Sequence, residues 1–220
     1  YHIDYFHSND SLGYRIFGNV VDPKDVCNTY GIDQIRYYML REVPFGNDGD
    51  FSENRLKARI NAELANDVGN LFQRTLSMVH KQCAGQTPAL LEVSDFDKKL
   101  FALAAQTLQE TRAHIDNFSF HKALDSIWVL IGAGNQYMEQ TQPWTLKKEN
   151  PAQMGHHLRV LMEALHVVAL LIEPFMPEAG QKFRSQLALQ KNNFLEIEQI
   201  PNLTVSALLP APQGVFPRVE

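Results

Sequence analysis

Several side chains in this sequence are of types that bind metals, but their spacing does not form a metal site. The two cysteines, Cys27 and Cys83, lack the paired spacing of a zinc site and are too few for a disulfide framework. His156 and His157 are adjacent, and adjacent residues of a helix point about 100° apart, unlike the i,i+4 histidine pair of a zinc enzyme. We therefore expect buried thiols, surface or core histidines, and no metal ligand.

The loops likewise indicate neither calcium nor nucleotide binding. Residues 46–50, Gly-Asn-Asp-Gly-Asp, are acidic and turn-rich, but no bidentate glutamate follows at the twelve-residue spacing of an EF-hand. Gly13 and Gly18 are isolated glycines, whereas a phosphate-binding loop needs a strand, a glycine cluster and a helix amino terminus in register. We expect residues 46–50 to be a connector, and we expect no catalytic residue and no cofactor.

The composition is that of a globular protein without a basic surface. The chain is 45% hydrophobic and 20% charged, with eleven prolines, which argues against a disordered or collagenous chain. Its formal net charge of −5 gives no global positive field, so any RNA contact must come from a local site. The longest apolar stretch, residues 160–176, is interrupted by Glu163, His166 and Glu173. This pattern favours a buried helix and no membrane insertion.

Helical periodicity dominates from Ser52 onward, and Ser52 itself is a suitable N-cap. The following apolar residues recur at three- and four-residue steps: Leu56, Ile60, Leu64, Val68, Leu71, Phe72, Leu76 and Val79. Further helices are predicted over residues 95–117, 118–140, 151–173 and about 178–187, bounded by proline and glycine breakers. The sequence thus predicts an all-α antiparallel helix bundle.

The two ends of the chain differ in character from this bundle. Residues 20–23 read as a short strand ending in a turn, followed by short helices over residues 25–30 and 33–41. Prolines at 201, 210, 212 and 217 predict an extended tail. We therefore divide the chain into a small module over residues 1–52, the bundle over 53–200, and the tail over 201–220. A first residue other than methionine leads us to expect a processed, trimmed or excised product.

Six runs of residues together resemble one family. They are Phe-Gly-Asn-Val-Val-Asp-Pro at 17–23, Tyr-Gly-Ile-Asp at 30–33, Arg-Tyr-Tyr-Met-Leu-Arg at 36–41, Val-Pro-Phe-Gly-Asn-Asp-Gly-Asp-Phe-Ser at 43–52, Asn-Ala-Glu-Leu-Ala-Asn-Asp-Val-Gly-Asn-Leu at 61–71 and Gln-Pro-Trp at 142–144. This combination is similar to bacterial-type methionyl-tRNA synthetases. The resemblance implies a stem-contact-like module followed by an anticodon-binding bundle of the class I synthetase type.

The resemblance also implies that Asn70, Arg74, Pro143 and Trp144 receive the CAU anticodon of methionine tRNA. Proteins that read RNA sequence usually bind unstacked bases, using an aromatic plane for stacking and amide or guanidinium groups for the base edges. Trp144 supplies a plane, and Asn70 and Arg74 supply hydrogen bonds. The structural alternative stays open, because an Asn and an Arg four residues apart are usually a solvated helix face, and a Trp after Pro usually anchors a loop.

One segment departs from the family pattern. The family carries Lys-Met-Ser-Lys-Ser directly before its Leu-Gly-Asn-Val-Val-Asp-Pro run, and those lysines stabilise charge on the ATP phosphates. An ungapped alignment instead places Leu12, Gly13, Tyr14, Arg15 and Ile16 there, so only one cation remains. This degenerate ATP signature predicts that the chain alone does not charge tRNA.

We accordingly expect a non-catalytic, methionyl-tRNA synthetase-like protein that binds methionine tRNA or another RNA. A first alternative is a structural subunit of a larger protein or ribonucleoprotein assembly, such as a mitochondrial ribosome. A second alternative is the tRNA-binding fragment of an active methionine-tRNA ligase. Both a mitochondrial location and the bacterial cytoplasm are compatible with the sequence.

Overall fold

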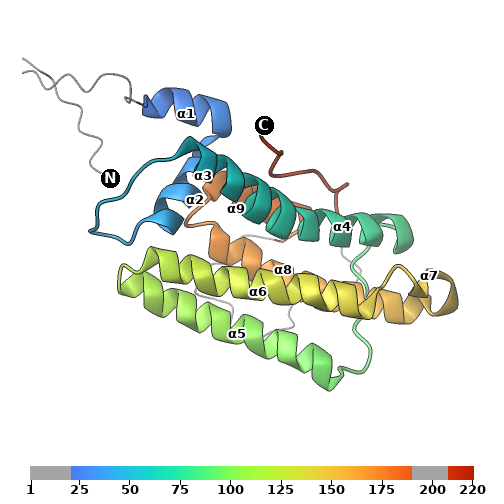
Figure 1. Ribbon diagram of the computed structural model, residues 1–220. Coiled ribbons are helices and arrows are strands. Elements are labelled where there is room, and N and C mark those ends of the chain that lie inside the picture. Colours follow the sequence, from blue (N-terminus) through green and yellow to red (C-terminus); the bar gives the residue numbers. More distant parts are fainter. Residues whose placement is uncertain (1–20, 190–207) are drawn as a thin grey trace, which may run out of the picture.

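The computed structural model describes residues 21–189 and 208–220. Within these ranges every regular element is a helix, and the only β-type pairing is an isolated bridge between Gln86 and Leu208 (Figure 1). The prediction of an all-α bundle is confirmed.

The described chain begins with two short helices, α1 (Pro23–Tyr30) and α2 (Ile32–Glu42). Asp22 caps α1, since its carboxylate accepts a 2.8 Å hydrogen bond from the backbone N–H of Lys24, and a proline at the first helical position is already suited to the helix. The strand predicted for residues 20–23 is therefore wrong over 21–23, where the chain forms a helix cap, and residue 20 lies outside the described ranges. Both predicted short helices are confirmed.

A long helix follows, with a change of winding in its middle. It comprises α3 (Glu53–Arg59), a π-helical segment η1 (Ile60–Gly69) and α4 (Asn70–Gln82). Ser52 caps its start as predicted, accepting from the backbone N–H of Arg55. The buried residues of η1, Ile60, Leu64 and Val68, lie at four-residue steps. The sequence pattern predicted the helix but not this segment.

The remaining helices form the bundle: α5 (Asp95–Asp116), α6 (Phe120–Thr141), α7 (Leu146–Glu149), α8 (Pro151–Ile172) and α9 (Pro177–Gln186). Figure 1 shows α5 and α6 lying antiparallel, with α8 between them and the α3–α4 helix. The four helices predicted after residue 94 are confirmed, and the short α7 was not predicted. The second of these four, α6, starts at Phe120 rather than residue 118, because Phe118 adopts a left-handed turn with a φ of 54°.

Helix α8 is the centre of the core. It is long and apolar enough to cross a membrane, but 94% of its most apolar window is buried inside the bundle. Its two internal charges also fit a buried helix, since Arg159 Nε and Glu163 Oε1 form an ion pair of 2.7 Å. These observations agree with the prediction of a core helix.

Side chains of α2 attach the leading module to the bundle. Arg36 Nε donates to the carbonyl of Phe175 at 2.8 Å, and the carboxylate of Asp33 accepts from the backbone N–H of Ala179 at 2.7 Å. Burial raises the pKa of Asp33, and the Ala179 hydrogen bond partly offsets that rise. Asp33 therefore satisfies a free N–H of the first turn of α9 from another part of the chain. The boundary placed at residue 52 stays a prediction.

The C-terminal residues 208–220 form an extended segment beside the long helix (Figure 1). The segment is fixed at one end by a 2.8 Å hydrogen bond from Leu209 N to Gly85 O. At its other end, the Asn61 amide donates to Val219 O at 2.8 Å and accepts from Val219 N at 2.9 Å. This part of the predicted tail is extended, and residues 201–207 lie outside the described ranges.

Candidate nucleic-acid interface

Helix α4 presents Asn70 and Arg74 one turn apart. Asn70 is exposed and the Arg74 side chain is 36% exposed. The backbone N–H of Asn70 still bonds to the carbonyl of Ala65, five residues earlier. Asn70 therefore stands where the π-helical winding gives way to the α-helix. Such local changes in winding are frequent at functional sites.

The loop after α6 presents Trp144. Gln142 ends the helix in a left-handed conformation with a φ of 41°, and Pro143 is buried. The loop closes on itself through hydrogen bonds from Thr145 N to Gln142 O at 2.9 Å and from Leu146 N to Pro143 O at 3.2 Å. Trp144 remains 40% exposed. Pro143 thus anchors the loop from inside, whereas Trp144 offers ring surface to a partner.

The structure brings Arg74 and Trp144 together. The guanidinium carbon of Arg74 lies 5.3 Å from the centroid of the Trp144 ring, within the range of a cation–π contact. Arg74 Nη1 also pairs with Glu139 Oε1 at 2.7 Å. Of the four residues expected at the site, two are in direct contact, Asn70 lies one helical turn away, and Pro143 supports the loop.

Glu139 is a member of the site that the sequence analysis missed. It lies in the last turn of α6, five residues before Trp144, and its side chain is 59% exposed. An exposed ion pair of this kind contributes about 1 kcal/mol or less. Arg74 can therefore exchange the carboxylate for another acceptor, such as a base edge or a phosphate, at small cost. Lys147 and Lys148, both exposed on α7, add positive charge to the segment that directly follows Trp144.

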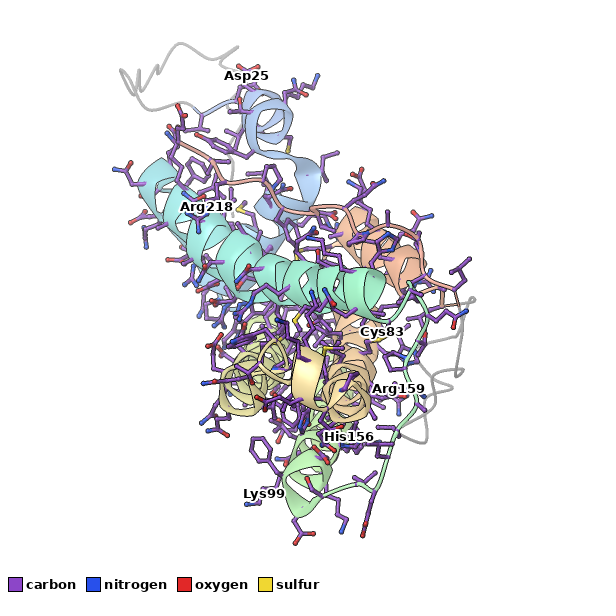
Figure 2. The ribbon with its side chains drawn as sticks, turned by 90° about the vertical axis from the view of Figure 1, so that its right-hand side faces the viewer. Asp25, Cys83, Lys99, His156, Arg159 and Arg218 are labelled. Atoms are coloured by element: carbon purple, nitrogen blue, oxygen red, sulfur yellow. The ribbon has the colours of Figure 1, made fainter. Side chains whose placement is uncertain are left out.

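A groove of about 330 Å³ opens on the other side of Asn70. Asn66, Asn70 and Gln73 line one wall, and Phe216 and Arg218 of the C-terminal segment line the other. Figure 2 shows Arg218 next to the long helix, well away from Lys99 on α5. The groove widens the polar surface around Asn70 with amide groups and one cation. Sequence reasoning missed it because the contact joins residues far apart in the chain.

The degenerate signature at residues 12–16 lies outside the described ranges.

Within the part of the chain that the structure covers, one group of side chains has the composition of a metal site: Asp97, His156 and His157, whose ligand atoms lie within 4.8 Å of one another. The sequence analysis had argued against a metal site here, because His156 and His157 are adjacent in a helix and were expected to point in different directions. However, the carboxylate oxygens of Asp97 and both nitrogens of each ring already have hydrogen-bond partners in the protein. The group therefore reads as a polar network.

Two family models match the chain. The anticodon binding domain of methionyl tRNA ligase matches residues 87–220, and the class I tRNA synthetase model for methionine matches residues 15–76. The methionine–tRNA ligase of Brucella suis is 41% identical over 203 residues, which are 91% of this chain and 39% of the relative. The ligase of Mycobacterium tuberculosis is 40% identical over 220 residues, covering 98% of this chain and 42% of the relative.

Solved structures agree with these matches. The apo crystal structure of Mycobacterium tuberculosis methionyl-tRNA synthetase superposes with a TM-score of 0.87 at 41% identity, covering 91% of this chain and 41% of that one. The same enzyme bound by methionyl-adenylate also gives a TM-score of 0.87, at 42% identity, with 91% and 40% of the two chains covered. The chain thus spans about two fifths of the length of the relatives that it matches.

Proposed function

The chain belongs to the methionyl-tRNA ligase family, and we propose that its helix bundle recognises the CAU anticodon of methionine tRNA. The observation that carries this proposal is the contact of Arg74 with the exposed ring of Trp144, one turn from Asn70. An aromatic plane beside a guanidinium and an amide is the combination that reads unstacked RNA bases.

In the proposed complex an anticodon base stacks on Trp144. Stacking of one base on an aromatic side chain contributes about 1 to 3 kcal/mol. Arg74 leaves Glu139 and donates to a base edge or a phosphate, while the Asn70 amide can both donate and accept. Stacking by itself tolerates any base, so we assign the discrimination between bases to the hydrogen bonds of Asn70 and Arg74. Only a CAU loop makes those hydrogen bonds and is thereby placed to stack on Trp144, so a permuted loop gains little from the ring.

Contacts to the RNA backbone come from a few local cations. Lys147 and Lys148 are exposed on α7, which follows Trp144 in the chain, and Arg218 lies at the groove beside Asn70. These residues supply positive charge next to the site in a chain whose net charge is −5. Phosphate contacts position an RNA without reading its sequence. We therefore expect modest binding to any RNA and tighter binding to the correct anticodon loop.

We propose further that this chain alone does not activate methionine. The support is the sequence at residues 12–16, where a single cation, Arg15, stands in place of the two lysines of the family signature. ATP–pyrophosphate exchange with methionine and the purified chain tests this point. Exchange above the level of a protein-free control would refute it.

The recognition proposal is tested by equilibrium binding of fluorescently labelled stem-loops that carry CAU or a permuted anticodon on the same stem. Tighter binding of CAU supports anticodon recognition. Equal binding of the two would overturn it. Isolation of the native chain in a large ribonucleoprotein that lacks methionine tRNA would favour the structural-subunit alternative.

A further inference from the structure

Tyr137 is a buried hydroxyl at the junction of three helices. It lies on α6, is 2% exposed, and its ring stacks on Phe96 of α5 with centroids 5.0 Å apart. Its hydroxyl donates to Asp97 Oδ1 at 2.5 Å and lies 2.8 Å from His157 Nδ1 on α8. One side chain therefore connects α5, α6 and α8.

The positions of the protons in this network follow from its partners. An ionised carboxylate only accepts, so the Tyr137 proton goes to Asp97, and the hydroxyl oxygen accepts from His157 Nδ1–H. His157 Nε2 then accepts from the side-chain amide of Gln153 at 3.1 Å. Burial and the neighbouring His156 lower the pKa of His157, which agrees with a neutral ring. Tyr137 and His157 thus form a directed hydrogen bond between α6 and α8.

This hydrogen bond closes the base of the loop that carries Trp144. Tyr137 lies one turn before Thr141, the last residue of α6, and the Thr141 hydroxyl donates back to the Tyr137 carbonyl at 2.8 Å. On the other side, His157 lies in the second turn of α8, after the N-cap Asn150. Residues 142–150 leave the bundle between these two points and return.

We propose that Tyr137 is a positioning residue for RNA recognition: its hydroxyl fixes the two ends of the 142–150 loop and so holds Trp144 beneath Arg74. Tyr137 is buried beneath the surface and acts through Trp144 without touching RNA. The role in RNA binding rests on the proposed function, whereas the role in holding the loop can be measured without RNA.

The first test reads Trp144 directly. The chain has two tryptophans, and Trp128→Phe leaves Trp144 as the only one while keeping an aromatic ring against Tyr37. In this background Tyr137→Phe removes one hydroxyl and keeps the stack on Phe96. We expect faster acrylamide quenching and lower anisotropy of Trp144. Unchanged quenching and anisotropy would overturn the proposal.

Ser94→Ala is the matched control. The Ser94 hydroxyl donates to the same carboxylate, at 2.7 Å from Asp97 Oδ2, and it also caps α5 by accepting from Asp97 N at 3.2 Å. Ser94 lies on neither α6 nor α8. Ser94→Ala should lower the free energy of unfolding by about as much as Tyr137→Phe does. It should leave the quenching and anisotropy of Trp144 unchanged. Equal changes of that signal in both variants would mean that Tyr137 has only a general structural role.

A second pair keeps the test valid if Tyr137→Phe does not fold. His157→Ala removes the partner of the Tyr137 hydroxyl, and His157→Asn restores a donor near Nδ1. We expect an increase of Trp144 quenching in the first variant and recovery in the second; no recovery would contradict the proposal.

If the wild-type chain discriminates CAU stem-loops, Tyr137→Phe should lower that affinity about tenfold, as loss of a buried hydrogen bond allows. If the wild type does not discriminate, the proposed function fails, while the fluorescence result still decides the role of Tyr137.

Discussion

The guanidinium of Arg74 lies over the ring of Trp144, at 5.3 Å from its centroid, and is held there by the carboxylate of Glu139. The two groups that we propose to contact RNA are thus already arranged in the free chain, and such an arrangement lowers the ordering cost of binding. In the proposed complex Glu139 would have two opposing effects, since it orients Arg74 and would also compete with the RNA for it.

Glu139→Gln tests which of these effects dominates. The amide still accepts a hydrogen bond from Arg74 but no longer neutralises it or repels phosphate. Because an exposed ion pair contributes about 1 kcal/mol or less, we expect affinity for RNA to rise by up to about fivefold, measured by fluorescence anisotropy. Asp95→Asn, which breaks the exposed Lys98 pair on α5, is the control and should change nothing. Weaker binding of Glu139→Gln would mean that orientation outweighs competition.

Gly69 tests the π-helical segment that precedes Asn70. A Cβ at this position would lie 2.8 Å from the carbonyl oxygen of Leu64, closer than the backbone tolerates. Gly69→Ala should therefore destabilise the chain by about 1 to 3 kcal/mol in urea unfolding, although Gly→Ala in a helix usually stabilises by up to about 1 kcal/mol.

Gly132→Ala is the matched control for Gly69, because a Cβ at that position of α6 meets nothing within 4 Å. It should stabilise the chain by about 0.5 to 1 kcal/mol. Stabilisation in both variants would show that the π-helical winding is not required at Gly69.

Asp97 gives the fold a specific dependence on pH. Burial raises the pKa of this carboxyl, but hydrogen bonds from Tyr137, Ser94 and His156 outweigh it and lower the pKa to about 2. The folded pKa is below the unfolded value of 3.8, so the stabilisation is present above about pH 4 and is lost as the pH falls toward 2. The free energy of unfolding of the wild type at pH 7 should therefore include a pH-dependent contribution of about 2 kcal/mol from Asp97. Asp97→Asn should lack this contribution.

Urea unfolding of the wild type and Asp97→Asn between pH 7 and pH 3 measures this difference, because the other titrating groups largely cancel between the two proteins. We expect a constant difference down to about pH 4 and a decline below it. A difference that does not depend on pH would contradict an ionised Asp97 in the folded state.

Arg218 tests the groove beside Asn70. If it contacts a phosphate, Arg218→Ala should weaken binding to CAU and permuted stem-loops alike and reduce the slope of log affinity against log salt by about 0.7. Lys99→Ala is the control, because Lys99 lies on α5, away from the groove (Figure 2). Loss confined to the CAU stem-loop would instead indicate that Arg218 contacts a base.

The sequence predicted the fold well where a local rule decides the outcome. Ser52, Pro151 and the apolar residues of the long helix determine where helices start and which face is buried, and the structure agrees at each. The strand expected at residues 20–23 is wrong over 21–23, because Asp22 and Pro23 together favour a helix start and outweigh the strand preference of the preceding Val-Val. The π-helical segment at Ile60–Gly69 was not predicted, because neither helix caps nor residue composition signals a change of winding inside a helix.

The residues of the candidate site, like the helices, were predictable from the sequence only in part. Resemblance to a family identified Arg74 and Trp144, and their contact is present in the structure. Glu139 and Arg218 escaped notice because each reaches the site from another helix or from the C-terminal segment, so no spacing along the sequence connects them to Asn70. The Asp97–Tyr137–His157 network depends on three helices and could be found only in the folded chain.

A crossed binding measurement tests most directly whether Trp144 contributes to reading the anticodon. Wild type and Trp144→Ala are each titrated with a CAU stem-loop and with a permuted-anticodon stem-loop of the same stem. We predict that Trp144→Ala weakens CAU binding by about 1 to 3 kcal/mol and leaves binding of the permuted loop nearly unchanged. An equal loss for both loops, or no loss for either, would contradict anticodon recognition by this chain.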